Sequence, residues 1–194
     1  MTGIIILAAG SSSRMGQPKQ QLVYQQQTLL QRAINIASGI AEHKTIVVLG
    51  ANHESILPDV DSKIADIVIN PDWEQGMASS IKSGVTALQT LYPQIQDALL
   101  MLCDQPFVTT EILLQLIATG GDNDKRIVAC TYQNTVGAPV LFGKQWFNEL
   151  LSLQGQEGAK KLIIKHQQHV LTVPFAHGEI DIDTPENYQD LLKR

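Results

Sequence analysis

The stretch that decides the fold is IIILAAGSSSRMGQPK, residues 4–19, where an apolar run passes directly into a loop rich in glycine and serine. Every residue of Ile4–Ala8 is apolar, as expected of a parallel strand covered on both faces. In an open parallel sheet, ligands bind beyond the carboxyl ends of the strands. The loop that follows this strand therefore lies where a ligand is expected.

Outward from this stretch, strand-like apolar runs alternate with helix-length segments along the whole chain. This order predicts an α/β fold, a three-layer Rossmann-like arrangement around a mostly parallel twisted sheet. The alternation weakens over residues 133–143, which we expect to form a small antiparallel excursion at the sheet edge. No linker or repeat interrupts residues 1–194, so we expect a single domain. The predicted strands are Ile4–Ala8, Thr45–Leu49, Ile64–Ile69, Ala98–Cys103 and Arg126–Tyr132, and the predicted helices are Thr28–Ser38, Met77–Leu91, Thr109–Ala118, Lys144–Leu153, Gly158–His166 and Pro185–Leu192.

The composition excludes several classes of protein. Of the 194 residues, 44% are hydrophobic and 17% charged, which is typical of a compact globular chain and not of a disordered regulator. A net charge of −5 argues against a nucleic-acid binder, which needs a basic face. The apolar run near the N-terminus is too short to span a bilayer and follows no basic region, so we expect no signal peptide and no membrane anchor. Cys103 and Cys130 form no CxxC motif, which favours a reducing cytoplasm.

The glycine-rich loop has the features of a phosphate-binding site. Gly10 and Gly16 allow backbone conformations and a close approach that a Cβ would block. Backbone N–H groups between them, together with the hydroxyls of Ser11–Ser13, can surround an anion. Arg14 and Lys19 add two cations to an otherwise acidic protein. The spacing fits neither a Walker A loop nor a GxGxxG fingerprint, and the alternative is an ordinary turn with solvated charges.

Two carboxylates are candidate metal ligands. Asp104 follows the apolar run Ala98–Cys103 and therefore lies on the same edge of the sheet as the glycine loop. Asp183 lies late in the chain, shortly before the helix predicted from Pro185. Two such oxygen ligands are what Mg²⁺ usually takes from a protein, with water and phosphate oxygens completing its octahedron. The alternatives are a turn residue at Asp104 and a helix N-cap at Asp183 or Thr184.

The segment LAAGSSSRMGQPK, residues 7–19, resembles the LA(A/G)GxSxRMGxxK signature of the MobA/MocA-like nucleotidyltransferases, which attach a nucleotide to the molybdenum cofactor. The resemblance continues in order through NPDWEQGMASS (70–80), CDQP (103–106), GAPVLF (137–142) and DIDTPE (181–186), and so covers most of the chain. It implies a Mg²⁺-dependent transfer of a nucleoside monophosphate from a nucleoside triphosphate to a phosphorylated acceptor, with release of pyrophosphate.

The resemblance also implies roles for individual residues. Arg14 and Lys19 would hold the triphosphate, and Asp104 with Asp183 would hold the Mg²⁺ ion. Arg14, Lys19 and Asp104 are accordingly the expected catalytic residues. Removal of the Asp104 carboxylate is expected to abolish turnover without unfolding the protein.

Residues around the start of the predicted helix Met77–Leu91 are implied to contact the nucleotide. Ser80 would help to read the base, as would Asn70, while ordinary helix capping by Ser79 or Ser80 is the alternative. The full set of implied nucleotide-binding residues is Leu7, Ala8, Ala9, Gly10, Ser13, Gly16, Asn70 and Ser80.

The resemblance suggests CTP as the donor and molybdopterin as the acceptor. Within the family, LAAG resembles the cytidylyltransferases and LAGG the guanylyltransferases, and the methyl group of Ala9 would narrow the pocket in favour of a pyrimidine. A molybdoenzyme is the partner that would take up the product.

Two departures from the cytidylyl pattern concern the acceptor. That branch reads GHPVLF and GDxGAR, where this chain has Ala138 in place of the histidine and GQEGAK at residues 155–160, ending in Lys160. Both lie in the half of the chain expected to face the acceptor. A sugar phosphate or alcohol phosphate acceptor, or a non-catalytic carrier of a nucleotide-bearing molybdenum cofactor, therefore stays open.

Overall fold

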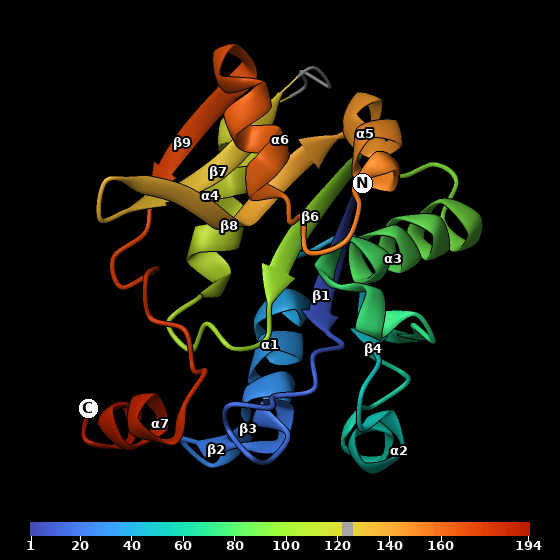
Figure 1. The fold of residues 1–194 in the computed structure, drawn as a ribbon. Helices are drawn as coiled ribbons and strands as arrows, with labels where there is room; N and C mark the ends of the chain where they lie inside the picture. Colours follow the sequence, from blue (N-terminus) through green and yellow to red (C-terminus); the bar gives the residue numbers. More distant parts are fainter. Residues whose placement is uncertain (122–125) are drawn as a thin grey trace.

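The computed structural model describes residues 1–121 and 126–194, and within them a seven-stranded sheet carries helices on both faces (Figure 1). The strand order is β5-β4-β1-β6-β8-β7-β9, and β8 alone runs antiparallel to its neighbours in this described sheet. The predicted α/β fold with a mostly parallel sheet is thus confirmed. The strands are β1 (Thr2–Ala8), β4 (His43–Leu49), β5 (Asp66–Ile69), β6 (Asp97–Leu102), β7 (Ile127–Tyr132), β8 (Thr135–Gly143) and β9 (Val170–Pro174), with a separate hairpin of β2 (Val23–Tyr24) and β3 (Gln27–Thr28).

Side chains of β1 alternate between two apolar cores, which is why both faces of the sheet are covered. Ile4 and Ile6 pack with α1 and α4, whereas Ile5 packs with α3, α5 and α6. None of the helices in the described part of the chain has the length and apolar character to cross a membrane. The α-helices are α1 (Leu29–Ser38), α2 (His53–Ile56), α3 (Met77–Leu91), α4 (Thr110–Gly120), α5 (Phe147–Ser152), α6 (Lys160–Lys165) and α7 (Pro185–Leu192), and short 3-10 turns cover Lys19–Gln21, Leu57–Asp59, Trp73–Gln75, Lys144–Trp146 and Gln167–His169.

The antiparallel segment lies in a different place from the one expected. Residues 133–143 do supply the antiparallel strand β8, but it is inserted between β6 and β7 rather than at the sheet edge. The physical reason is the apolar run Val140–Phe142, which is buried on both faces and needs a helix on each side. The prediction was right about the direction of this strand and wrong about its position.

Helix α7 packs against the N-terminal loop and the β2–β3 hairpin instead of covering the sheet (Figure 1). Met15 of the glycine-rich loop and Ile182 belong to a third apolar cluster that joins these segments. The Tyr188 hydroxyl donates to the Val23 carbonyl over 2.7 Å, and the Ile182 amide donates to the Asp104 carbonyl over 3.0 Å. The residues that precede α7 are therefore held beside the carboxyl end of β6.

Candidate active site

The glycine-rich loop and the carboxyl ends of β1 and β6 enclose a cavity of about 320 Å³, which we call the loop cavity. It lies at the carboxyl edge of the parallel strands, where the sequence predicted a ligand site. The first turn of α3 and Gln156, from the segment before α6, complete its walls. The sequence-predicted residues that line the loop cavity are Leu7, Ala8, Ala9, Gly10, Lys19, Ser80 and Asp104.

Lys19 joins the two candidate metal ligands. Its ammonium donates a hydrogen bond to Asp104 Oδ2 and another, over 3.0 Å, to Asp183 Oδ1. Burial alone would lower the pKa of Lys19, but the neighbouring Asp104 carboxylate and the hydrogen bonds to both aspartates raise it above its ordinary value. Lys19 is therefore a permanent positive charge at the wall of the loop cavity.

Asp183 also pairs with Arg14, whose guanidinium donates to Asp183 Oδ2 over 2.9 Å. Partial burial would raise the pKa of Asp183, but the hydrogen bonds and charges of Lys19 and Arg14 hold it below its ordinary value. The side chain that caps α7 is Thr184, in a capping box with Asn187. The N-cap alternative thus applies to Thr184, and the Asp183 carboxylate faces the two cations. Arg14 is 69% exposed, so its pairing is a solvent-screened contact that a ligand can replace.

The two carboxylates fit a divalent cation. Asp104 Oδ1 is buried and has no hydrogen-bond partner in the described residues, a costly arrangement for a carboxyl oxygen unless another group binds it. The Asp183 side chain is 33% exposed and leaves room for water. Mg²⁺ commonly takes only one or two protein carboxylates together with substrate phosphates. No cluster of three or more His, Cys, Asp or Glu that could hold a metal occurs among residues 1–121 and 126–194.

Sequence reasoning missed a third carboxylate, Asp181. Loss of solvent around its carboxyl group, and next the charges of Asp104 and Asp183, raise the pKa of Asp181 to about 7. The available signal was the Asp-x-Asp spacing, which brings both carboxyls to one short extended segment. Asp181 does not line the loop cavity but a neighbouring one.

That neighbouring cavity, of about 330 Å³, shares the walls Leu7, Met77 and Leu102 with the loop cavity, and we call it the side cavity. Apolar residues of β6 and β8 line it together with a set of polar side chains. Two of the three positions that depart from the cytidylyl pattern, Ala138 and Lys160, lie in its lining, whereas the third, Gln156, lines the loop cavity. The polar lining residues are Gln105, Tyr132, Thr135, Lys160, Glu179 and Asp181.

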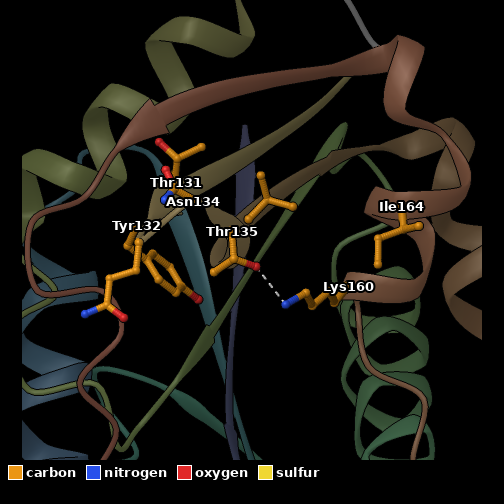
Figure 2. Close-up of a pocket in the computed structure, with 8 residues that line it drawn as sticks. Thr131, Tyr132, Asn134, Thr135, Lys160 and Ile164 are labelled. Carbon is orange, nitrogen blue, oxygen red and sulfur yellow. Dashed lines mark hydrogen bonds between the residues drawn. The ribbon is translucent and has the colours of Figure 1, made fainter.

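An open groove of about 620 Å³ adjoins the side cavity and shares several of its residues. Figure 2 shows Lys160 reaching from α6 towards Thr135 of β8, to whose hydroxyl it donates over 2.8 Å. Tyr132 lies on the opposite side of Thr135 in the same view. The Lys160 ammonium therefore lies where the groove and the side cavity meet.

Gly10 and Gly16 differ in what a side chain would disturb at each position. Gly16 has a φ of +76°, a conformation that favours glycine, as expected. Gly10 has no positive φ, and a Cβ there would meet nothing within 4 Å, so Gly10 leaves open space at the cavity instead of forming a left-handed turn. Gly16, Ser13 and Arg14 do not line the loop cavity.

Asn70 is not brought to the loop cavity. It is buried, and its amide donates to Ser79 Oγ over 2.8 Å and to Ser80 Oγ over 3.1 Å. Its own Oδ1 accepts from the Asp72 amide over 3.0 Å. The N-cap of α3 is Gly76, without a side-chain cap, so the two serines are not helix caps. Asn70 instead fixes Ser80, which does line the cavity.

Comparisons with known proteins agree with this geometry. The MobA-like NTP transferase domain model matches residues 4–170. The chain is 26% identical to the molybdenum cofactor cytidylyltransferase of Escherichia coli (strain K12), over 95% of this chain and 92% of that protein. It is 27% identical to the purine catabolism protein PucB of Bacillus subtilis (strain 168), over 98% and 95%. The crystal structure of Rv0371c from Mycobacterium tuberculosis is 32% identical, with a TM-score of 0.85 over 100% of this chain and 97% of that one. A structure of the same mycobacterial protein with manganese is 29% identical, with a TM-score of 0.78 over 99% of this chain and 97% of that one.

Proposed function

The chain belongs to the MobA-like NTP transferase family, and on that premise we propose that it transfers CMP from CTP to a phosphorylated acceptor, for which molybdopterin is the first choice. The observation that carries the proposal is the position of Lys19 between Asp104 and Asp183 at the wall of the loop cavity. A buried cation and two carboxylates beside a glycine-rich loop suit a metal-bound triphosphate. A carrier protein would need only to bind a nucleotide.

In the proposed reaction the triphosphate lies against Lys19 and the backbone N–H groups of the glycine-rich loop. Arg14 leaves Asp183 and adds a second positive charge. A phosphate oxygen of the acceptor attacks the α-phosphorus in line, forming a new phosphorus–oxygen bond and breaking the bond to the leaving pyrophosphate. Because a phosphate nucleophile is already ionised at neutral pH, the protein acts by positioning and charge neutralisation and needs no general base.

We assign Mg²⁺ to Asp104 and Asp183. When bound there, the ion would neutralise charge on the triphosphate oxygens. The unpartnered Asp104 Oδ1 supports this assignment, and so does the manganese in the mycobacterial relative. The protein would contribute two carboxylate ligands and the loop that holds the phosphates.

CTP is proposed over GTP on two grounds. Ala9 is buried at the wall of the loop cavity, so that its methyl group takes space a larger base would need. The relative from Escherichia coli is a cytidylyltransferase. Both support a pyrimidine nucleotide.

The acceptor would bind in the side cavity, next to the α-phosphate of CTP. Lys160 and Ala138, which stand where the cytidylyl pattern has Arg and His, line this cavity and favour keeping a sugar phosphate or alcohol phosphate as the second candidate acceptor. We place the reaction in the cytoplasm, with a molybdoenzyme as the partner for a molybdopterin product.

Pyrophosphate release tests the proposal. Purified protein with Mg²⁺ and molybdopterin should release pyrophosphate with CTP and not with GTP, ATP or UTP. The same assay with sugar and alcohol phosphates separates the candidate acceptors, and Lys160→Ala should raise the KM of the true acceptor while leaving the KM of CTP unchanged. If the protein binds CTP but releases no pyrophosphate with any acceptor, the result would contradict the enzyme and favour the non-catalytic carrier.

A further inference from the structure

Gln20 is a buried polar side chain to which the proposed reaction gives no role. It directly follows Lys19 in the chain and is 1% exposed. Its side chain forms hydrogen bonds with the glycine-rich loop. The amide nitrogen donates to the Ala8 carbonyl over 2.7 Å and to the Gly10 carbonyl over 3.1 Å. The Gln20 side-chain oxygen accepts from Ser12 Oγ over 3.4 Å. A single side chain therefore binds two backbone carbonyls and one serine hydroxyl of the loop.

These contacts determine which way the loop amides point. A trans peptide group is planar, and its N–H points away from its C=O. The Ala8 carbonyl shares a peptide group with the Ala9 amide, and the Gly10 carbonyl shares one with the Ser11 amide. Because the Gln20 amide nitrogen binds both carbonyls, the Ala9 and Ser11 N–H groups point away from that nitrogen.

Ala9 and Ser11 line the loop cavity, as Gln20 does, so a ligand bound in the cavity can supply an acceptor for these amides. Within residues 1–121 and 126–194, neither amide donates a hydrogen bond to another group of the protein. The intervening carbonyl, that of Ala9, is held separately by the Ala51 amide over 3.0 Å. All three peptide groups of this stretch are thus fixed, and two of their donors are left for a ligand.

We propose that Gln20 is a positioning residue for nucleotide binding, which orients the Ala9 and Ser11 amides so that they donate to oxygen atoms of the nucleotide. This inference rests on the proposed function, because it needs a nucleotide in the loop cavity. The oxygen atoms belong either to the base or to the phosphates. Preorganised donors of this kind favour binding because no reorientation is needed when the ligand arrives.

The test compares two matched substitutions. Gln20→Met keeps the length of the side chain and removes its donors and its acceptor. Gln21→Met is the control, because the Gln21 amide donates to the Ser55 carbonyl over 2.9 Å and to Asp59 Oδ2 over 2.9 Å and does not line the loop cavity. CTP affinity is measured by calorimetry, and the melting temperature is measured for each variant.

Gln20→Met should weaken CTP binding about tenfold or more, the size expected for losing one or two oriented hydrogen bonds. Gln21→Met should bind CTP within about twofold of the wild type, whatever its melting temperature. Equal CTP affinity in Gln20→Met and the wild type would overturn the inference alone. A wild type that binds no nucleoside triphosphate would overturn the proposed function as well.

A second measurement uses the wild type and needs no folded variant. In ¹⁵N-labelled protein, the amide resonances of Ala9 and Ser11 should shift on titration with CTP, whereas the Ala51 amide should stay near its position. Separate titrations with cytidine and with inorganic pyrophosphate assign each amide to the base or to the phosphates. Ala9 and Ser11 resonances that stay unmoved at saturating CTP would contradict the inference.

Discussion

The ammonium of Lys19 donates a hydrogen bond to Asp183 Oδ1 over 3.0 Å, across 164 positions of the chain. The same ammonium donates to Asp104 Oδ2, just after the end of strand β6. Lys19 therefore links an N-terminal loop, a central strand and the segment before the C-terminal helix. Helix α7 makes this possible because its apolar contact with the glycine-rich loop brings Asp183 to the sheet edge. The candidate site is therefore assembled by tertiary packing and not by one local motif.

Asp104→Asn should lower the rate of pyrophosphate release by at least about 100-fold, the scale on which removing one preorganised charge-stabilising group lowers the turnover of an enzyme. The fold should survive, because Asn keeps the volume and Lys19 retains Asp183 as a partner. Steady-state turnover and the melting temperature are the measurements. Asp190→Asn is the control, since Asp190 pairs only with the surface residue Lys193 in the described structure. Near wild-type turnover in Asp104→Asn would exclude the metal assignment.

An added methyl group should affect stability at one glycine of the loop cavity and CTP binding at another. Gly76 has a φ of +106°, and a Cβ there would lie 2.4 Å from the Gly155 carbonyl oxygen, so Gly76→Ala should cost at least about 1–3 kcal/mol of stability. Gly10→Ala meets nothing within 4 Å and should melt close to the wild type while binding CTP more weakly. Thermal melts and CTP titrations of both variants check this. A Gly10→Ala variant that binds CTP normally would remove Gly10 from the nucleotide site.

Asp181 predicts a pH-dependent stability. Loss of solvent and the charges of Asp104 and Asp183 raise its pKa from the ordinary 3.8 to about 7. Because the folded state holds this proton more tightly than the unfolded state, stability falls as the pH rises from about 4 to about 7 and stays reduced above that. Asp181→Asn removes the effect, so its melting temperature should exceed that of the wild type by more at about pH 8 than at about pH 4. The same difference at both pH values would show that the carboxyl is not perturbed.

The two cysteines should be inert in the native protein. Burial raises the pKa of Cys103 to about 12, with the Asp104 charge adding to the effect, and burial likewise raises the pKa of Cys130 to about 12. The reactive thiolate is therefore scarce at neutral pH. Mass spectrometry after iodoacetamide treatment should find neither thiol alkylated in the native protein and both alkylated in denaturant. Rapid alkylation of native Cys103, which lines the loop cavity, would mean that the reagent reaches its thiol through this cavity.

Much of the fold follows from local patterns. The wholly apolar run of β1 and its alternation with helical segments predicted the parallel sheet, and the apolar runs ending in Ala8 and Cys103 placed the loop and Asp104 on one edge. The position of β8 could not be read in the same way. The apolar run Val140–Phe142 requires that both faces of β8 be covered, but it does not specify which strands lie on either side, and contacts between distant segments decide that.

The site shows the same division. Lys19 and Asp104 follow recognisable motifs, and the structure brings them together as expected. Asp181 and Gln20 were missed because their surroundings cannot be read from the sequence. Asp181 lies near the carboxylates of Asp104 and Asp183, and Gln20 lies against two loop carbonyls. Asn70 was predicted to contact the nucleotide, but the structure turns its amide to Ser79 and Ser80.

The most direct test of the central claim follows the phosphorus atoms of CTP. Protein, Mg²⁺ and molybdopterin are incubated with CTP labelled in parallel reactions at the α- or the γ-phosphate, and the products are separated. The α-label should enter the acceptor as a nucleotide adduct, while the γ-label should leave in pyrophosphate. An α-label recovered only in free CMP or in unreacted bound CTP, with every candidate acceptor, would contradict nucleotidyl transfer by this protein.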